Sequence, residues 1–576
     1  MILKALYDYY QRSKGSLPSF GKEEKEIGFL IVLDKKGRFL RFEDCRIDKK
    51  RSSTFLVAKH VGRSSAITPN TLYDSADYVL GYSEKSPQKA LEKVQAFKER
   101  VEEISEKLPD NQDILAVKAF YDSDHQERLA LMQQDPLWPE IAKNLDKKYS
   151  VFSFLLNGDT RIVAEKDEIL DALVAESVDG SDICLITGEK CKPVTITTAT
   201  MIPGSQAIAK LVAVQVKSGY DSYGKEKATN SPIGEKAEFA YSTALNHLLA
   251  RDSRNKFSLG DRTYVFWTSK EGDTGKQIEE GFSALLGLSR EENPDKGIEQ
   301  VRKTLMGIYT GSIRTDLDDR FYILGLAPNS ARIAVVYWSE TSLKEMAGAI
   351  LRHYDDMEIT DGRKEKKPYK GLHSILAAVT LGGKSSDATP NLPDALAKSI
   401  FQGLPYPYTL FASCIRRIRA EQTIGIVRVA IIKAFLSRLD NQNKIGIMLD
   451  KENTNQGYLF GRLFAVLDKI QADANNQHTI RERYMNAASS TPAAVFATII
   501  NLSSHHAEKL SEGRKVYFDK LKQEIMDKIS VDGFPSHLNL QDQGRFFVGF
   551  YHQQQAFFGS ASIWVKIPVP FYVTIE

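Results

Sequence analysis

Apolar residues recur every three or four positions over several stretches of the chain, and elsewhere they form short continuous runs. The first pattern is that of an amphipathic helix, and the second is that of a buried strand. Runs of strand type occupy 29–33, 38–42, 262–268 and 321–338. The first two predict a hairpin, and a turn at Pro328–Asn329 is predicted to break the last. Helical spacing marks one face of the stretch 87–108, formed by Leu91, Val94, Phe97, Val101 and Ile104.

The C-terminal part of the chain carries the helical pattern almost without interruption. A segment rich in Gly, Ser and Pro at 381–393 predicts a linker ahead of it. From Met448 onward the spacing predicts a bundle of four helices. We expect Thr491 to cap one of these helices ahead of Pro492, and Asn539 to cap the last.

These patterns predict an α+β protein with more than one domain, because 576 residues exceed what a single hydrophobic core accommodates. We expect a mixed α/β N-terminal domain with irregular sheets over 1–380, a helical connector over 394–447, and an all-helical C-terminal bundle over 448–576. The tail 560–576 is apolar and irregular, and the pattern predicts no element for it.

Composition narrows the classes of protein. Hydrophobic residues make up 42% of the chain and the formal net charge is +3, so any basic surface must come from local clustering. No apolar run reaches about 18 residues and the N-terminus lacks a signal-peptide core, so we predict a cytoplasmic protein without a membrane span. The four cysteines lack CxxC spacing, and no metal or cofactor is expected.

Two polar segments are candidates for binding an anion. The first is the stretch 221–249, a loop with Gly224, Lys225 and Asn230 that leads into a helix. Exposed backbone N–H groups at a helix start favour a phosphate, although most such loops are only turns. The second is 59–81, which gathers Lys, Arg, Ser, Asn and Thr residues and reads equally well as an ordinary surface loop.

A third candidate is the helical stretch 408–439, where basic residues greatly outnumber acidic ones. Such a stretch can bind a nucleic-acid backbone, or it can be a solvated helix face. Its arginines are Arg416, Arg417, Arg419, Arg428 and Arg438.

Motifs of catalysis are weak. The segment 272–276 (GDTGK) resembles a phosphate loop, but Gln277 stands where Ser or Thr would bind magnesium. Asp316, Asp318 and Asp319 could hold a metal, yet turn carboxylates are far commoner. Binding is therefore favoured over catalysis by a metal-dependent nuclease or an NTPase, and a scaffold that binds partners and no DNA stays a further alternative.

Several segments together resemble one family. In chain order they are MILKALYDYY, RSSAITPNTLYDSADYVLGY, CLITGE, SYGKEKATNSPI with YSTALNHLL, LGLAPNSAR and DQGRFFVGFYHQQQ. This ordered set, from Met1 to about Gln555, closely resembles the large subunit of the type I-C CRISPR surveillance complex, Cascade. Such subunits often carry a glycine-rich loop near the motif site, whereas the segment 201–215 offers only Gly204.

The resemblance implies a non-catalytic, DNA-binding subunit. Such subunits lie beside the CRISPR RNA-bound backbone and handle-binding subunits of Cascade. They recognise the protospacer-adjacent motif in double-stranded target DNA, promote strand separation and R-loop formation, and help recruit the helicase–nuclease. The division of labour is physical: the protein reads a short duplex motif, and pairing with the guide reads the rest.

Site residues follow from the polar segments once this function is implied. We expect Asn70 and Asn230 to read base edges, and Lys59, Arg63 and Lys225 to contact phosphates, with Ser64 and Thr71 beside them. Gln206 is the candidate wedge between the strands. The arginines of 408–439 are candidates for binding the displaced strand.

The resemblance also implies a second gene product. In this subtype the small subunit comes from an internal start within the large-subunit gene. Met448 stands at the beginning of the predicted bundle, so we expect a short product that starts there or nearby.

Overall fold

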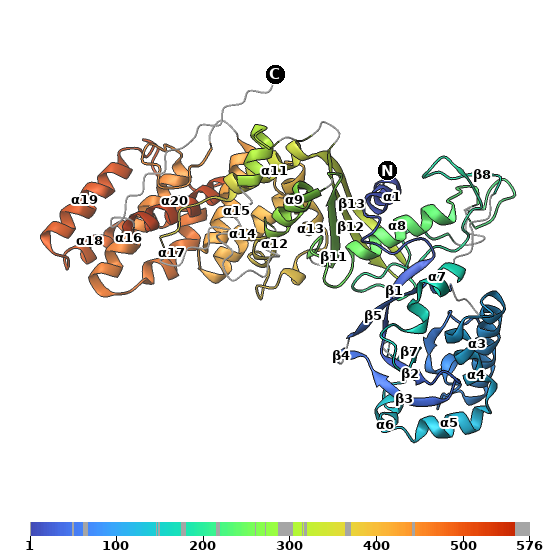
Figure 1. Cartoon of the computed structure of the whole chain (residues 1–576). Coiled ribbons are helices and arrows are strands. Elements are labelled where there is room, and N and C mark those ends of the chain that lie inside the picture. Colours follow the sequence, from blue (N-terminus) through green and yellow to red (C-terminus); the bar gives the residue numbers. More distant parts are fainter. Residues whose placement is uncertain are drawn as a thin grey trace. The chain divides into compact units, whose positions relative to one another are not determined.

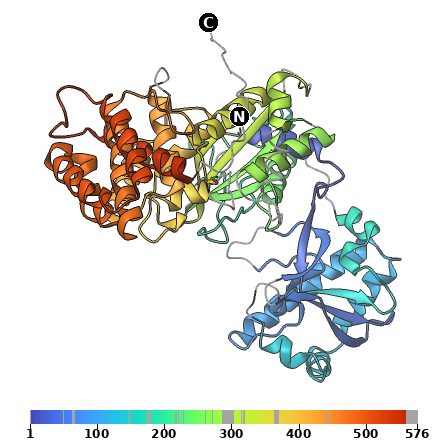
Figure 2. The same ribbon diagram turned by 90° about the vertical axis from the view of Figure 1, so that its left-hand side faces the viewer.

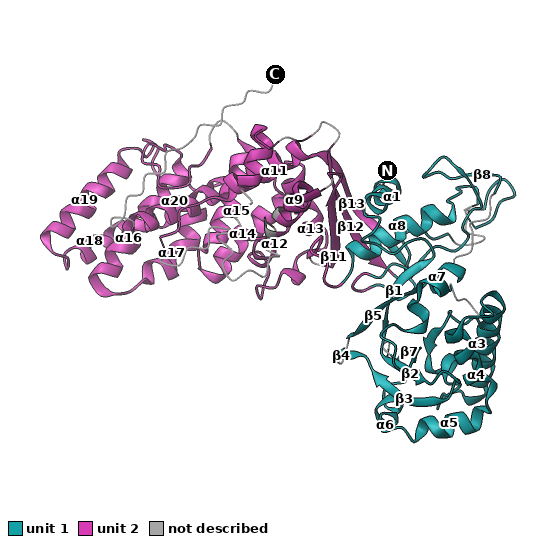
Figure 3. Ribbon diagram, viewed as in Figure 1, with its two compact units in different colours: residues 1–201, 205–250, 330–333 teal, residues 202–204, 251–329, 334–576 magenta. Residues whose placement is uncertain are grey.

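A computed structural model describes residues 2–48, 51–61, 67–145, 147, 150–173, 180–214, 219, 221–227, 229–259, 261–270, 272–285, 303–313, 315, 319–362, 370–440 and 444–558. The chain divides into two compact units (Figure 3). Unit 1 comprises Met1–Met201, Ser205–Ala250 and Ser330–Ile333, and unit 2 comprises Ile202–Gly204, Arg251–Asn329 and Ala334–Glu576. The α+β class is confirmed, while the three predicted segments 1–380, 394–447 and 448–576 are drawn differently from these units and stay a prediction.

Unit 1 is built on a four-stranded sheet of order β3-β2-β7-β6. β2 (Phe29–Leu33) and β3 (Phe39–Asp44) form the predicted antiparallel hairpin. β7 (Val151–Leu156) runs parallel to β2, and β6 (Tyr73–Ser75) is antiparallel to β7. All five residues of β2 are buried, because a central strand covered on both faces needs apolar side chains on both.

Helices cover this sheet. α3 (Pro87–Lys107) and α4 (Gln112–Asp122) lie on one side of it (Figures 1 and 2). The predicted face of α3 is buried at Val94, Phe97, Val101 and Ile104, whereas Leu91 is 43% exposed. The shorter elements are α2 (Ala76–Val79), α5 (His125–Gln133), α6 (Trp138–Ala142), η1 (Val163–Glu165) and α7 (Asp167–Leu173).

A second sheet of unit 1 has the order β1-β5-β4. β1 (Lys22–Ile27) pairs antiparallel with β5 (Arg51–Ala58), which in turn pairs with β4 (Arg46–Asp48). Helix α1 (Ile2–Arg12) packs against α8 (Glu235–Leu248), where Tyr10 meets the Phe239 ring edge-on at 5.7 Å. A small hairpin of β8 (Asp182–Ile183) and β9 (Lys190–Cys191) encloses the CLITGE segment.

Unit 2 contains a four-stranded sheet of order β10-β11-β12-β13. Its strands are β10 (Lys256–Leu259), β11 (Arg262–Thr268), β12 (Arg320–Asn329) and β13 (Arg332–Ser342). The predicted strands are confirmed, but the break falls after Asn329, where Ser330 adopts a positive φ of 54°. Pro328 stays within β12, so the turn prediction was two residues early.

Helices α9 (Gly272–Leu285), α11 (Leu343–Met357) and one over 303–310 accompany this sheet. A capping box between Ser342 and Glu345 starts α11, because each side chain bonds the backbone N–H of the other residue. Among the described residues from 343 to 558, every regular element is helical. These are α12 (Leu372–Ala377), η2 (Ser385–Asp387), α13 (Leu392–Phe401), α14 (Tyr408–Glu421), α15 (Ile426–Leu439), α16 (Gln456–Asn475), α17 (Thr479–Ser490), η3 (Pro492–Ala494), α18 (Phe496–Ala507), α19 (Glu512–Met526) and α20 (Leu540–Phe558).

Two predictions about this bundle hold only in part. Over the described residues 448–558 it has five α-helices rather than four, because the polar sequence of α17 hides its helical period. Thr491 stands at the N-cap position of the short helix η3 with Pro492 at its start, as predicted, but its side chain makes no cap hydrogen bond there. Its hydroxyl instead donates to the Ala487 carbonyl at 3.3 Å and closes α17, and α18 starts at Phe496. The Asn539 cap is confirmed, since its side-chain oxygen accepts from the Asp542 N–H at 2.9 Å.

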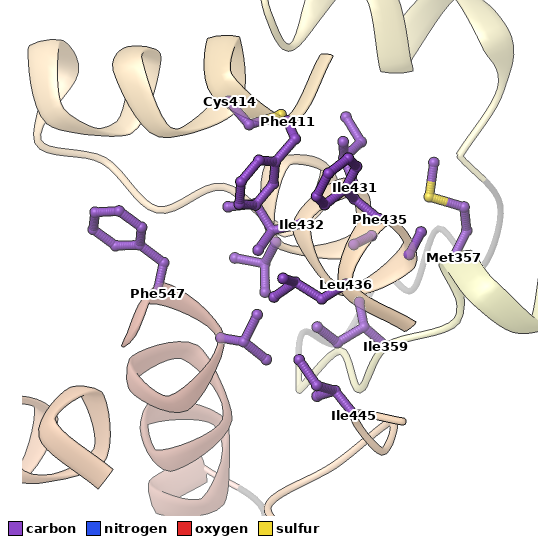
Figure 4. Close-up of a cluster of buried hydrophobic side chains, with 14 of the residues drawn as sticks. Met357, Ile359, Phe411, Cys414, Ile431, Ile432, Phe435, Leu436, Ile445 and Phe547 are labelled. Carbon is purple, nitrogen blue, oxygen red and sulfur yellow. The ribbon is translucent and has the colours of Figure 1, made fainter. Parts of the chain in front are cut away.

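The packing in this part of unit 2 is close. A Cβ placed on Gly461 of α16 would lie 2.0 Å from the Phe546 carbonyl oxygen of α20, and one on Gly549 would lie 2.2 Å from the Tyr458 carbonyl oxygen. The two backbones therefore touch. Figure 4 shows Phe547 of α20 in one buried cluster with the side chains of α14 and α15.

Candidate nucleic-acid interface

A pocket of about 900 Å³ in unit 1 gathers basic side chains from segments distant in the sequence. Lys25, Lys59, Lys210 and Arg332 line it together with His60. All five residues are half-buried, so each keeps part of its surface accessible while the rest packs in the wall. The net charge of the chain is close to zero, so a basic surface requires local clustering of cations, and this pocket is such a cluster.

The backbone places these cations. Lys25 stands on β1, and Lys59 directly follows β5, with its N–H bonded to the Gly21 carbonyl at 2.7 Å. Lys210 and Arg332 are joined by a parallel bridge, in which the Ile333 N–H donates to the Lys210 carbonyl at 3.0 Å. Main-chain hydrogen bonds therefore hold the pocket wall independently of its side chains.

A carboxylate, Glu238 of α8, also lines the pocket. Its side chain is only 5% exposed. It accepts hydrogen bonds from the Thr198 N–H at 2.6 Å and the Thr198 hydroxyl at 3.2 Å, and it forms an ion pair with the Lys59 ammonium at 3.2 Å. Lys59 in addition lies over the Phe239 ring at 5.1 Å, so two consecutive residues of α8 fix this one cation.

Burial sets the charge balance of the pocket. It lowers the pKa of Lys210, and the Glu238 carboxylate opposes that change. Glu23 lies behind the wall and hydrogen-bonds both His60 and Tyr73. Burial by itself raises the pKa of Glu23, but these hydrogen bonds and the nearby charges outweigh it, so the pKa lies below its ordinary value.

Two of the seven residues predicted to read the motif, Lys59 and Asn70, line this pocket. Asn70 is 8% exposed, and its side-chain oxygen accepts from the Val61 N–H at 3.0 Å while its own N–H donates to Asp74 at 2.8 Å. Asn70 therefore also anchors the backbone on which it stands. Thr71 beside it is buried, and Arg63 and Ser64 lie outside the described residues.

The other predicted motif contacts lie elsewhere in unit 1. Lys225 and Asn230 are exposed on the loop before α8, and Lys225 pairs with Asp182 at 2.9 Å. Neither residue lines the pocket. Gln206, the candidate wedge, is exposed, and its N–H donates to the Ser330 carbonyl at 3.2 Å, close to the segment that carries Arg332.

Most arginines of the predicted displaced-strand surface, all in unit 2, have partners within the fold. Arg438 is 2% exposed at its side chain; it pairs with Asp356, donates to two main-chain carbonyls and lies 4.0 Å from the Tyr406 ring centre. Arg417 and Arg428 share Glu421 as a counter-ion, which places its pKa below the ordinary value. Arg419 approaches the Gln543 oxygen at 3.5 Å.

Arg416 differs from these four. Its side chain is exposed on α14 and donates to the Ser413 hydroxyl at 2.9 Å. Met448 is also exposed, at 60%, and precedes α16. The internal-start prediction is not addressed by this position, but all five bundle helices follow it in the chain.

The segments that suggested catalysis have other structures. Residues 272–276 form the first turns of α9, whereas a phosphate loop wraps its N–H groups around the ligand before the helix begins. Asp319 pairs with Lys270 at 3.1 Å, and Asp316 and Asp318 lie outside the described residues. Within the described ranges no group of three or more His, Cys, Asp and Glu side chains could hold a metal ion.

Sequence reasoning missed Lys25, Lys210, Arg332 and Glu238. The four residues are far apart in the sequence and none of them was predicted as a site residue, so only folding brings them within one pocket. Charge clusters along the sequence drew attention to 408–439 instead. One feature of the sequence could have pointed to Glu238: it is an acidic residue on the buried, apolar face of the helix α8.

The family model described as CRISPR-associated protein (Cas_Csd1) matches residues 6–558. The chain belongs to the Cas_Csd1 family. A search of the curated proteins finds no match. Membership makes the chain a CRISPR-associated protein of Cascade type over nearly its whole length. Among the helices that the structure describes, none is long and apolar enough to cross a membrane.

Proposed function

We propose that this Cas_Csd1 chain is the non-catalytic DNA-binding subunit of a type I-C surveillance complex that reads the protospacer-adjacent motif. The observation that carries the proposal is the basic pocket of unit 1. It contains Lys59 and Asn70, both expected from the sequence, and adds the cations Lys25, Lys210 and Arg332.

The chemistry of the pocket suits duplex DNA. Lysine and arginine side chains neutralise backbone phosphates and position a protein on the duplex, while an asparagine amide can pair with a base edge. Several half-buried cations around one polar side chain offer both kinds of contact. Binding through such phosphate contacts depends steeply on salt, which gives the proposal a measurable signature.

The partners in this proposal are the CRISPR RNA-bound backbone and handle-binding subunits, double-stranded target DNA, the helicase–nuclease, and a small subunit made from an internal start. DNA melting by Gln206 would cost roughly a few kcal/mol of unstacking per step, offset by phosphate contacts. Weighing the products of the untagged gene tests the small subunit. A short band that survives replacement of the Met448 codon would rule out a start at that residue.

The experiment for the central claim uses the assembled complex. Binding to duplexes with and without the motif is titrated at several salt concentrations, for the wild-type subunit and for Asn70→Ala. We expect Asn70→Ala to reduce the preference for the motif, while hydrogen exchange of residues 67–74 shows whether the backbone around Asn70 keeps its structure. Equal binding of complexes with and without this subunit would instead favour a scaffold, and cleavage of labelled DNA or ATP by the purified chain with divalent metals would favour an enzyme.

A further inference from the structure

The pocket holds its own anion in the place where an anionic ligand would bind. Glu238 is buried in the pocket lining, and its carboxylate meets the Lys59 ammonium at 3.2 Å. The same carboxylate interacts electrostatically with Lys210 on the opposite stretch of chain. A phosphate that enters the pocket must therefore compete with an existing partner of these cations.

We infer that Glu238 is an internal counter-ion that limits the affinity of the pocket for nucleic-acid phosphates, so that a bound phosphate replaces the carboxylate as the partner of Lys59. The inference rests on the proposed function, because it takes DNA as the ligand. It assigns Glu238 as a positioning residue: the carboxylate acts through Lys59 and holds the ammonium in the pocket while no ligand is present.

Three contacts explain why the carboxylate stays while its partner exchanges. The Thr198 N–H and hydroxyl both donate to Glu238, so the acid keeps two neutral partners when Lys59 turns away. Lys59 is 27% exposed at its side chain and lies on a flexible four-carbon stem, so its ammonium can reorient toward the solvent side. The Phe239 ring, 5.1 Å from the ammonium, is the third contact, and it belongs to Lys59 rather than to the carboxylate, so its change on reorientation leaves the Thr198 bonds of Glu238 in place.

A counter-ion of this kind has effects of opposite sign on stability and on binding. Without the carboxylate, Lys59 and Lys210 repel one another in a half-buried pocket, which destabilises the free protein. The same cations are then released for a ligand phosphate, which strengthens binding. A residue that merely supports the fold would lower both stability and affinity when replaced, so the two signs separate the explanations.

The main test is Glu238→Gln in the assembled complex. We expect affinity for duplex DNA at low salt to rise about fivefold, both with and without the motif, because a partly exposed ion pair is worth up to roughly that factor. We expect the slope of log affinity against log salt to steepen by up to about one phosphate contact. The melting temperature should fall at the same time.

Glu235→Gln is the matched control, since it makes the same charge change one turn earlier on α8 at an exposed position that does not line the pocket. It should change affinity less than twofold on the scale of an exposed charge. In a Lys59→Met background, Glu238→Gln should lose most of its effect, because the cation that it releases is gone. Equal effects of E238Q and E235Q, or weaker binding by a folded E238Q complex, would overturn the inference.

Two further measurements keep the outcome interpretable. If E238Q does not fold, Glu238→Asp keeps the charge and the Thr198 acceptor but is one methylene shorter, and a smaller gain in affinity is expected; a loss would count against the inference. Binding of inorganic tripolyphosphate to the purified chain tests the counter-ion without DNA. If E238Q bound tripolyphosphate more tightly while no complex preferred DNA with the motif, Glu238 would still be a counter-ion of the pocket, but the proposed function would be wrong.

Discussion

Positive charge is used differently in the pocket of unit 1 and in the helices of unit 2. In the pocket, Lys210 and Lys59 stand half-buried beside one carboxylate and face a space of about 900 Å³. In unit 2, Arg438 and Lys433 are buried among carbonyl oxygens and carboxylates. The sequence offered both regions as DNA surfaces, the first for the motif and the second for the displaced strand, whereas the surroundings of each cation favour the first.

Whether a cation can bind an external anion depends on its partners within the fold, and not on how many charges lie near it in the sequence. A buried cation needs hydrogen-bond acceptors within the fold, and once these are in place its loss is felt as lost stability. A half-buried cation on a pocket wall retains capacity for an external anion. The following predictions test that contrast, from the largest expected effect to the smallest.

Replacement of Arg438 by Met should destabilise unit 2 by about 3–5 kcal/mol, because Asp356 and the carbonyls of Ser399 and Leu404 would remain buried without their donor. Thermal unfolding, with hydrogen exchange of peptides from α13 and α15, measures the loss. If the R438M protein kept its stability but bound single-stranded DNA more weakly, Arg438 would be a DNA contact, and the proposed difference between the two units would be wrong.

The second prediction concerns Lys433, whose ammonium donates to the carbonyls of Asp355 and Asp356 at 3.2 and 3.0 Å. Burial lowers the pKa of Lys433 from 10.5 to about 8. Between these values the unfolded chain binds more protons than the folded one, so stability from this residue rises with pH across that window.

The free energy of unfolding of the wild type, relative to that of Lys433→Met, should therefore rise by about 2 kcal/mol between pH 7.5 and pH 10. Urea unfolding at the two pH values measures it, and the comparison with the variant cancels the titration of other groups. A constant difference would mean that Lys433 is not a buried cation of the kind described.

The third prediction returns to unit 1. Lys210→Met should weaken binding of the assembled complex to all duplexes and reduce the salt slope by about one, while stability changes by less than about 0.5 kcal/mol. Lys236→Met is the control, since it removes an exposed lysine of α8 that does not line the pocket. Identical salt slopes for the two variants would remove the pocket from the proposed interface.

The smallest effect is expected at Arg416, the exposed arginine of α14. Arg416→Gln should leave stability within about 0.5 kcal/mol of wild type and lower the salt slope for single-stranded DNA by at most about 0.7. Arg417→Gln is the comparison, because Arg417 is already paired with Glu421 at 2.9 Å. A larger binding loss for Arg417 than for Arg416 would contradict the assignment of paired arginines to the fold.

The elements of the fold were largely legible in the sequence. Periodicity gave the 29–42 hairpin, α3, β11 and the helical C-terminal part, because each rests on local spacing of apolar residues. Where polar composition hides the period, as in α17, the helix was missed. The β12 turn was misplaced because Pro328 reads as a breaker, yet strands can carry a proline where no ladder hydrogen bond is needed.

Only part of the candidate site could be predicted from the sequence. Lys59 and Asn70 stood out because they occur in one conspicuous polar segment, and both line the pocket. Lys25, Lys210 and Arg332 were invisible, since a pocket wall built from strands and bridges joins residues hundreds of positions apart. Arg438 was predicted to bind DNA because it lies in a basic stretch of sequence. The sequence does not show that Asp356, on another helix, pairs with it.

The backbone contact between α16 and α20 has a consequence during synthesis. α16 is buried on nearly all sides, and the helix that covers it at Gly461 begins some 65 residues after α16 ends. At translation rates of about 5–20 residues per second, α16 waits roughly 3–13 s for its partner. During that interval the many apolar side chains of α16 are accessible to chaperones and to other nascent chains. Since both helices follow Met448, a product that starts there would meet the same delay.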